Sequence, residues 1–221
     1  MQQQQQQQQQ SQQQQQQQQS QQQQSQQQPQ QQNQPYQQPN RYQGIIISGF
    51  GGQGILSIGR VIAQAGLDEG MNATWLPSYG PEIRGGTAYC HVILSDNPIG
   101  SPLLNSATAL IAMNKPSAEK YHNLIVEGGL MIVDGSLIDS VPEGFDNSKR
   151  RYFSLPATET ALRNGTAAFA NIILAGKLIA ETGIITVNGF EAALRKVLSA
   201  RYQHLIPKEM EMLQFGMEYG L

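Results

Sequence analysis

A short apolar run that ends in a cluster of glycines constrains the fold of this chain more than any other feature. Residues 44–48 (GIIIS) are mostly β-branched, residues 49–54 read GFGGQG, and residues 54–67 then carry apolar side chains at helical spacing. A β-branched run favours a buried strand, and an apolar stripe with a period near 3.6 favours a helix. The order of strand, glycine turn and helix therefore predicts the first unit of an α/β fold.

The rest of the chain continues this alternation. Further strands are predicted at 72–76, 87–94, 107–113, 130–133 and 151–155, and helices at 114–126, 167–181, 188–200 and 208–219. Residues 77–86 hold two prolines and three glycines and are predicted to form a loop. Because the strand at 87 follows a loop rather than a helix, we expect a Rossmann-like, mostly parallel sheet with at least one antiparallel strand or hairpin. Helices should cover both faces, and the C-terminus should be helical.

The glycine loop is the first candidate binding site, and it comprises Gly49, Gly51, Gly52, Gln53 and Gly54. It fits the pattern G-x-G-x-x-G. The first glycine allows a tight turn, the second lets a ligand approach the backbone, and the third lets the helix pack closely on the strand. The start of the following helix offers unpaired amides and a partial positive charge. The loop therefore predicts a phosphate or another anion as ligand.

Three alternatives to such a site stay open. A nicotinamide dinucleotide requires a carboxylate at the end of the second strand, whereas Asp68 and Glu69 precede that strand. A P-loop requires Lys followed by Ser or Thr after the glycines, and neither is present. The glycines can also serve a strand-to-helix turn for steric reasons alone. A free-standing dinucleotide-binding module and a scaffold with purely structural glycines are therefore the competing interpretations.

The segment after the second predicted strand is the second candidate site. Trp75, the only tryptophan, precedes it, and Glu82 and Arg84 lie two residues apart at the sheet end where ligands of such folds bind. Arg84 can clamp a carboxylate or a phosphate with two hydrogen bonds, while a surface ion pair is the alternative. The candidate residues of this segment are Ser78, Tyr79, Glu82, Arg84, Gly85, Gly86 and Thr87.

Side chains that catalyse reactions or bind metals are scarce. Cys90 is the only cysteine, so the chain cannot form an internal disulfide, a multi-cysteine zinc site or an iron–sulfur cluster. Its position within a predicted strand indicates a small buried side chain. His91, His122 and His204 show no metal-binding spacing and are interpreted as structural. We predict no catalytic residue and no metal site.

Composition excludes further classes of protein. The net charge of -2 and the pI of about 5.9 argue against a nucleic-acid partner. No apolar run reaches membrane-spanning length, and the N-terminus lacks the pattern of a signal peptide, so we expect a cytoplasmic chain without a membrane partner. Residues 1–40 hold 30 Gln and are predicted to be disordered, as an assembly or spacer segment or a tolerated expansion. Residues 41–221 form the predicted domain.

Two motifs, in this order and at this separation, resemble a known family. They are GFGGQGI at 49–55 and TWLPSYGPEIRGGTAYC at 74–90, followed by IGSP at 99–102 and NKPS at 114–117. Over nearly all of residues 44–220 the chain resembles the gamma subunit of the 2-oxoacid:ferredoxin oxidoreductases. The second motif is more similar to the 2-oxoglutarate or branched-chain members than to the pyruvate members. We favour 2-oxoglutarate on that resemblance.

The resemblance implies a division of labour among subunits. A 2-oxoacid, coenzyme A and oxidised ferredoxin would give an acyl-CoA, carbon dioxide and reduced ferredoxin. Thiamine diphosphate, Mg and iron–sulfur clusters are expected on alpha and beta partners, with or without a delta subunit, and coenzyme A is the substrate associated with the gamma part. The glycine loop would then bind the coenzyme, and residues 78–87 would form a subunit contact or the coenzyme entrance. The isolated chain is expected to be inactive.

Overall fold

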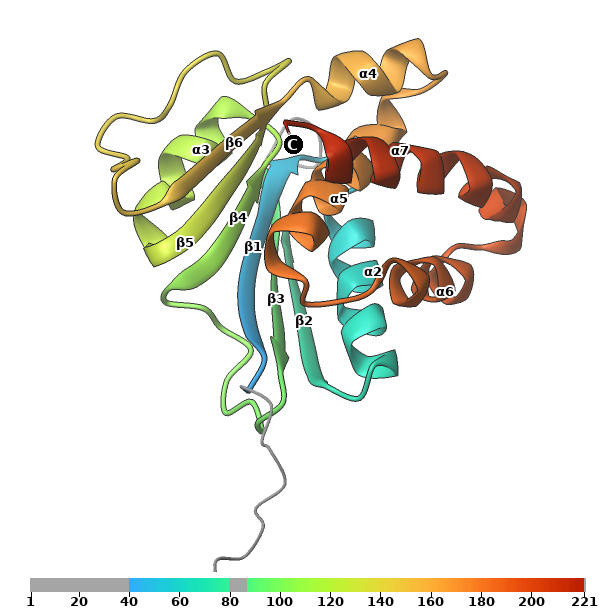
Figure 1. Ribbon diagram of the computed structural model, residues 1–221, viewed down its shortest axis with the longest axis horizontal. Coiled ribbons are helices and arrows are strands. Elements are labelled where there is room, and N and C mark those ends of the chain that lie inside the picture. The colour runs from blue at the N-terminus through green and yellow to red at the C-terminus, as the bar shows by residue number, and fades with distance from the viewer. Residues whose placement is uncertain (1–39, 80–86, 221) are drawn as a thin grey trace, which may run out of the picture. The chain divides into compact units, whose positions relative to one another are not determined.

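The computed structural model describes residues 40–79 and 87–220, whose sheet and helices are shown in Figure 1. The described residues form a sheet in the order β2-β3-β1-β4-β5-β6. The strands are β1 (Tyr42–Phe50), β2 (Asn72–Tyr79), β3 (Thr87–Ser95), β4 (Ala107–Ala112), β5 (Ile125–Asp134) and β6 (Arg151–Leu155). The glutamine tract lies outside the described residues, so the predicted domain boundary stays a prediction.

The strand directions confirm the predicted mixed sheet. β1, β4, β5 and β6 are mutually parallel, whereas β3 runs antiparallel to both β1 and β2. The central residue Ile47 lies opposite Cys90 of β3 on one side and Ile111 of β4 on the other. Since β1 has a hydrogen-bonded strand on each side, its backbone is satisfied within the sheet.

Both faces of β1 are buried, which explains its unbroken apolar run. Ile45 and Ile47 belong to the larger core with α2 (Ile55–Asp68), α5 (Ala170–Thr182) and α6 (Val187–Val197). Ile46 belongs to a smaller core on the opposite face with α3 (Lys115–Tyr121). Figure 1 shows α3 on one side of the sheet and α2, α5 and α6 on the other. Helices therefore cover both faces, as predicted.

The helical C-terminus packs through two glycines. α7 (Ile206–Glu218) follows a 3₁₀ segment at Ala200–Leu205 and lies against α5. A Cβ on Gly176 of α5 would overlap the carbonyl of Leu213, and one on Gly216 of α7 would overlap the carbonyl of Ile173. The two helix backbones therefore approach each other more closely than side chains at these positions would permit.

Three sequence predictions about element boundaries were wrong. Residues 77–79 continue β2 instead of opening a loop, because Pro77 lies on an edge strand that tolerates a missing amide. The predicted helix to 126 ends at Tyr121, and a 3₁₀ turn at His122–Leu124 leads into β5. The two glycines at 128–129, directly after the predicted helix, lie within β5 beside a register shift.

Two helix starts also differ from the predictions. The short helix α4 (Ala157–Arg163) was not predicted. The residue that accepts hydrogen bonds from its first turn is distant in the sequence, so no local pattern indicates the helix; this contact is described below. α6 begins after Thr186, whose Oγ1 accepts a hydrogen bond from the Gly189 amide, whereas the predicted helix began at residue 188. α3 begins where the sequence predicted it, and Asn114 caps it, since its Oδ1 accepts a 2.8 Å hydrogen bond from the Ser117 amide.

Candidate functional site

The glycine loop connects the carboxyl end of β1 to the first turn of α2. A tight turn forms where the Gln53 amide donates a 3.3 Å hydrogen bond to the Phe50 carbonyl. Gly54 follows with φ 75° and ψ 17°, a left-handed conformation that caps the helix without a side-chain hydrogen bond. α2 therefore begins directly after Gly54, where the glycine pattern predicts a helix start.

The glycines of this loop meet different constraints. A Cβ on Gly49 would press against Gln53, Ile55 and Met113, so Gly49 allows close packing at the end of β1. A Cβ on Gly51 or Gly52 would meet open space, and Gly52 has a φ of 98°. Gly51 and Gly52 are exposed. The outer part of the loop is thus the part that a ligand can approach.

Gln53 holds the turn closed and does not project from it. Its Oε1 accepts a 2.6 Å hydrogen bond from the Phe50 amide, and its Nε2 donates a 3.0 Å hydrogen bond to the Met113 carbonyl. Met113 directly follows β4, so the side chain crosses the crevice between the ends of β1 and β4. The sequence predicted Gln53 as a cofactor-binding residue. The structure shows its side chain hydrogen-bonded within the turn, and its part in ligand binding stays a prediction.

Asn171 is a residue of this site that the sequence did not reveal. It lies in α5, is 7% exposed, and its Nδ2 donates a 3.2 Å hydrogen bond to the Gln53 carbonyl. A Cβ on Gly54 would overlap this amide nitrogen. Asn171 therefore fixes the loop from a helix 118 residues further along the chain. A polar residue within an otherwise apolar helix was the only available signal.

The backbone amides beside the loop give it a positive potential. The first intrahelical hydrogen bond runs from the Ile58 amide to the Gly54 carbonyl, so the amides of residues 55–57 have no helical acceptor. The first turn of α2 contains no acidic side chain. A 14-residue helix adds a partial positive charge at this end. The arrangement suits a phosphate or another anion.

The loop also lies between β1 and β4, where the connections from neighbouring parallel strands run to opposite sides of the sheet. β1 leads through α2 to one side of the sheet, whereas β4 leads through α3 to the other side and along the opposite face. Ligands of open α/β sheets bind at such switch points, outside the carboxyl ends of the strands. Beneath the crevice, Ser48 of β1 and Ser117 of α3 are joined by a 2.8 Å hydrogen bond between their hydroxyl oxygens.

Only part of the second candidate segment falls within the described residues, and that part lies beside the glycine loop. Thr87 pairs with Phe50, and Ala88 pairs with both Gly49 and Tyr79, so the ends of β1, β2 and β3 meet at one edge. Ser78 and Tyr79 belong to β2 rather than to a loop. Four further candidates lie outside the described residues: Glu82, Arg84, Gly85 and Gly86. Their roles stay predictions.

Cys90, His91 and His122 are buried within the fold. Cys90 is fully buried, and this burial raises the pKa of its thiol to about 12, so it is a packing residue, as predicted. Burial lowers the pKa of His91, whose Nδ1 accepts a 3.1 Å hydrogen bond from the Leu104 amide. Burial and then the charge of Arg150 lower the pKa of His122.

Asp134, the last residue of β5, has hydrogen bonds to both of its carboxylate oxygens. Its Oδ1 accepts 3.1 Å hydrogen bonds from the amides of Ser136 and Thr158, and its Oδ2 accepts one from the Thr158 hydroxyl. This fully buried carboxyl group anchors the first turn of α4. Among residues 40–79 and 87–220, no three His, Cys, Asp or Glu side chains converge as a metal site would require.

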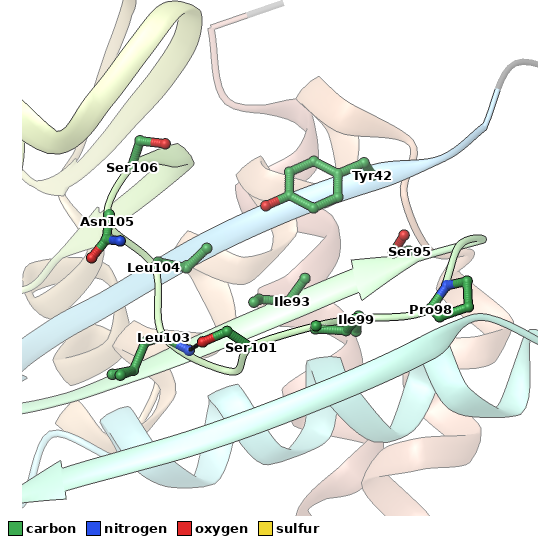
Figure 2. A pocket seen from close by; sticks show the side chains of 11 residues that line it. Tyr42, Ile93, Ser95, Pro98, Ile99, Ser101, Leu103, Leu104, Asn105 and Ser106 are labelled. Atoms are coloured by element: carbon green, nitrogen blue, oxygen red, sulfur yellow. Dashed lines mark hydrogen bonds between the residues drawn. The ribbon is translucent and has the colours of Figure 1, made fainter.

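Hollows among the described residues lie near both ends of β1. The first, of about 390 Å³, lies beside the first turn of α2 and is lined by Leu56, Ser57, Arg60, Trp75, Pro77, Val197, Leu198, Ser199 and Tyr202. Figure 2 shows the second, of about 300 Å³, where Tyr42, at the start of β1, lies near the IGSP segment and Leu104. The first hollow touches the first turn of α2, which follows the glycine loop in the chain.

The described part of the chain is thus a switch-point α/β domain whose glycine loop leads into a helix with three amides that have no helical acceptor. Residues 44–219 match the family described as pyruvate ferredoxin/flavodoxin oxidoreductase. Ketoisovalerate oxidoreductase subunit VorA of Methanothermobacter thermautotrophicus is 35% identical over 176 residues, which are 79% of this chain and 35% of the relative. 2-Oxoglutarate synthase subunit KorC of that organism is 37% identical over 155 residues, which are 68% of this chain and 82% of the relative.

Solved structures agree with these matches. The gamma subunit of a keto/oxoacid ferredoxin oxidoreductase from Geobacter sulfurreducens has 30% identity and a TM-score of 0.68, covering 80% of this chain and 95% of that one. The fold also recurs in 2-oxoglutarate:ferredoxin oxidoreductase from Magnetococcus marinus, solved with 2-oxoglutarate, coenzyme A and succinyl-CoA bound. Its TM-score is 0.71 at 22% identity, covering 80% of this chain and 30% of that one.

These findings identify the family. The chain belongs to the pyruvate ferredoxin/flavodoxin oxidoreductase family and is similar to gamma subunits of the 2-oxoacid:ferredoxin oxidoreductases. It spans about a third of the length of the ketoisovalerate relatives that it matches. No helix among the described residues is long and apolar enough to cross a bilayer.

Proposed function

We propose that this chain is the coenzyme A-binding gamma subunit of a 2-oxoacid:ferredoxin oxidoreductase, and that its glycine loop binds phosphate of the coenzyme. One observation carries the proposal. The exposed Gly51 and Gly52 lie next to the uncapped amides of α2, at the switch point of the sheet. The Magnetococcus relative, which shares the fold, has coenzyme A bound. An anionic, elongated ligand suits a loop of this kind.

The oxidative chemistry belongs to partner subunits in this proposal. Cys90 is buried within the core and is the only cysteine, so this chain does not fit an iron–sulfur cluster. Asp134 is saturated by Thr158 and Ser136, so it does not fit a thiamine–magnesium site. Alpha and beta subunits, with or without a delta subunit, would hold thiamine diphosphate, Mg and the clusters. Ferredoxin would accept the electrons through the assembled complex.

We favour 2-oxoglutarate as the substrate and succinyl-CoA as the product. The support is the KorC relatives of three further sources, which match this chain at 34–37% identity over most of their own length. The ketoisovalerate relatives match at a similar identity, so a branched-chain 2-oxoacid is the second candidate. A pyruvate member matches at 27%.

The segment after β2 is proposed as a subunit contact or the coenzyme entrance. Thr87 lies opposite Phe50, directly before the exposed glycines, and β2 ends at the same edge. A molecule seated on the glycine loop would therefore pass this segment. Glu82 and Arg84, which fall between these strands, are the residues proposed to make the contact.

Reconstitution tests the proposed function. The chain should be co-expressed with its alpha and beta partners, and dye reduction should be assayed with a panel of 2-oxoacids in the presence and absence of coenzyme A. We expect turnover that requires coenzyme A, with 2-oxoglutarate as the best substrate, and no turnover by the isolated chain. Turnover by the lone chain, or binding of NAD(P) to it, would instead support the dinucleotide-binding alternative.

A bulky residue at Gly51 tests the loop itself. The site of its Cβ is open and its backbone is not left-handed, so Gly51→Trp should fold normally while blocking the approach of a ligand. We expect the KM for coenzyme A to rise at least about tenfold. Leu162→Trp, at an exposed position of α4, controls for the added bulk. An unchanged KM in Gly51→Trp would assign the glycines to a purely structural role.

A further inference from the structure

A further hollow lies between α3 and the segment that follows β5, and we call it the α3 groove. It is lined by Lys115, Ala118, Glu119, Ile138, Ser140, Val141, Pro142 and Glu143. Its floor is apolar, because Ala118, Ile138 and Pro142 are buried. Its volume of about 260 Å³ lies below the range of roughly 300–1,000 Å³ that small-molecule sites occupy. The groove therefore suits one side chain of another protein better than a free ligand.

The α3 groove lies on the more thinly covered face of the sheet. Figure 1 shows α3 and the segment that joins β5 to β6 on one side, and α2, α5, α6 and α7 on the other. α3 has seven residues, and the core on its side is the smaller one. Val141, which lines the groove, is 38% exposed, and Leu137, next to the buried Ile138, is 46% exposed. Exposed apolar side chains around a hollow are typical of a protein contact.

The rim of the α3 groove carries two carboxylates without a counter-ion. The Nζ of Lys115 lies 3.5 Å from the Oδ1 of Asp139, so this lysine is already paired. Glu119 follows Lys115 by one helical turn, and Glu143 belongs to the segment that forms the other wall. Both glutamates are exposed, and neither has an ion pair or a hydrogen bond among the residues that the structure describes. The rim therefore has an excess of negative charge.

A long basic side chain matches both the apolar floor and the acidic rim. Its methylene stem can lie on Ala118 and Ile138 while its charged head binds carboxylates at the rim. An acidic segment would be repelled by Glu119 and Glu143. A neutral segment would cover these two carboxylates without giving them a partner, which costs free energy. Charge complementarity therefore selects a basic occupant.

We infer that the α3 groove receives an arginine or lysine side chain of a partner subunit, and that Glu119 and Glu143 bind its charged head. The inference rests on the proposed function, in which alpha and beta subunits complete the enzyme. It places a subunit contact on the α3 face of the sheet, in addition to the contact proposed for the segment after β2. A second copy of this chain is the occupant that the experiment has to distinguish from a partner subunit.

Binding of the full chain to its purified alpha–beta partner complex tests the two glutamates. A double variant, Glu119→Gln with Glu143→Gln, should bind at least about tenfold more weakly and should lose much of the salt dependence of the wild type. Its melting temperature should be unchanged, because both side chains are exposed and unpaired. The matched control is Glu211→Gln with Glu218→Gln, two exposed positions of α7, which should bind like the wild type.

Photocross-linking of the assembled enzyme identifies the occupant. A benzoylphenylalanine at Leu137, which is 46% exposed beside the groove, should cross-link to a peptide of the alpha or beta subunit that contains Arg or Lys. Replacing that basic residue with Met should weaken assembly about as much as the double glutamine variant does. In the background of the double variant the Met replacement should have no further effect, because both changes remove the same contact.

Failure of this inference is distinguishable from failure of the proposed function. If the double variant assembles like the wild type and the complex turns over a 2-oxoacid with coenzyme A, the groove inference fails while the function stands. The same holds if the cross-links reach only a second copy of this chain, or if additive effects of the Met replacement and the double variant show that the two sites do not touch. If the wild-type chain does not bind the alpha–beta complex, the proposed function fails and the groove inference fails with it.

Discussion

Replacing Gly54 with alanine tests whether Asn171 fixes the glycine loop. Gly54 has a φ of 75°, and a Cβ there would overlap the Nδ2 of Asn171. The left-handed backbone costs a non-glycine residue about 1–2 kcal/mol. Displacing the Asn171 amide also breaks its hydrogen bond to the Gln53 carbonyl and strands buried polar atoms, which costs about 1–3 kcal/mol. We expect Gly54→Ala to lower the free energy of unfolding by about 2–5 kcal/mol.

A double-mutant cycle isolates the contact with Asn171. In an Asn171→Ala background the overlap is gone, so Gly54→Ala should add only the backbone cost, about 1–2 kcal/mol, which gives a coupling energy of about 1–3 kcal/mol. Gly52→Ala is the matched control, because Gly52 has a φ of 98° but open space around it, and its effect should add to that of Asn171→Ala. Urea denaturation of the full chain measures each value. Additivity of Gly54→Ala and Asn171→Ala within about 0.5 kcal/mol would refute the reasoning.

Three further predictions concern buried ionisable groups. Burial lowers the pKa of His91, so the unfolding free energy of the wild type, measured by urea denaturation, should fall relative to His91→Gln as the pH drops below about 6.5. Burial raises the pKa of Glu209, so Glu209→Gln should raise the melting temperature at pH 7, and the gain should vanish towards about pH 4. The thiol of Cys90, with a pKa of about 12, should react with iodoacetamide only in denaturant, and rapid labelling of the native chain would contradict its burial.

The first strand and helix are predictable because every signal they need is local. The β-branched run, the glycines and the apolar stripe of 54–67 occupy adjacent positions, and the structure places β1 and α2 there. The end of α3 is not predictable in this way. Ile125 pairs with Ala107 of β4, and Gly128, with a φ of 77°, lies within the irregular part of β5. The pairing of β5 with β4 ends the helix earlier than predicted, and the local sequence carries no signal of this pairing.

The candidate site shows more clearly that local sequence signals do not reveal distant contacts. Gly49 and Gly54 could be assigned from their spacing alone, but the residue that fixes them could not. Asn171 and Lys177 interrupt an apolar helix, and the structure gives each a distant partner. Asn171 bonds to the Gln53 carbonyl, and Lys177 is 2% exposed and donates a 3.0 Å hydrogen bond to the Tyr219 carbonyl. A polar residue in a buried helix signals such a contact without naming its partner.

Asp68 and Glu69, the acidic residues considered for a dinucleotide site, make their contacts at the far end of α2. Asp68 forms a 2.8 Å ion pair with Lys196, and Glu69 accepts hydrogen bonds from the amide and hydroxyl of Thr186. In nicotinamide-binding folds a carboxylate at the second strand selects a free ribose hydroxyl, whereas an arginine nearby selects a phosphorylated ribose. Arg60 lines the hollow beside α2, and β2 itself carries no carboxylate within residues 72–79. The described residues at the end of β2 therefore lack the acidic ribose anchor that a nicotinamide dinucleotide needs.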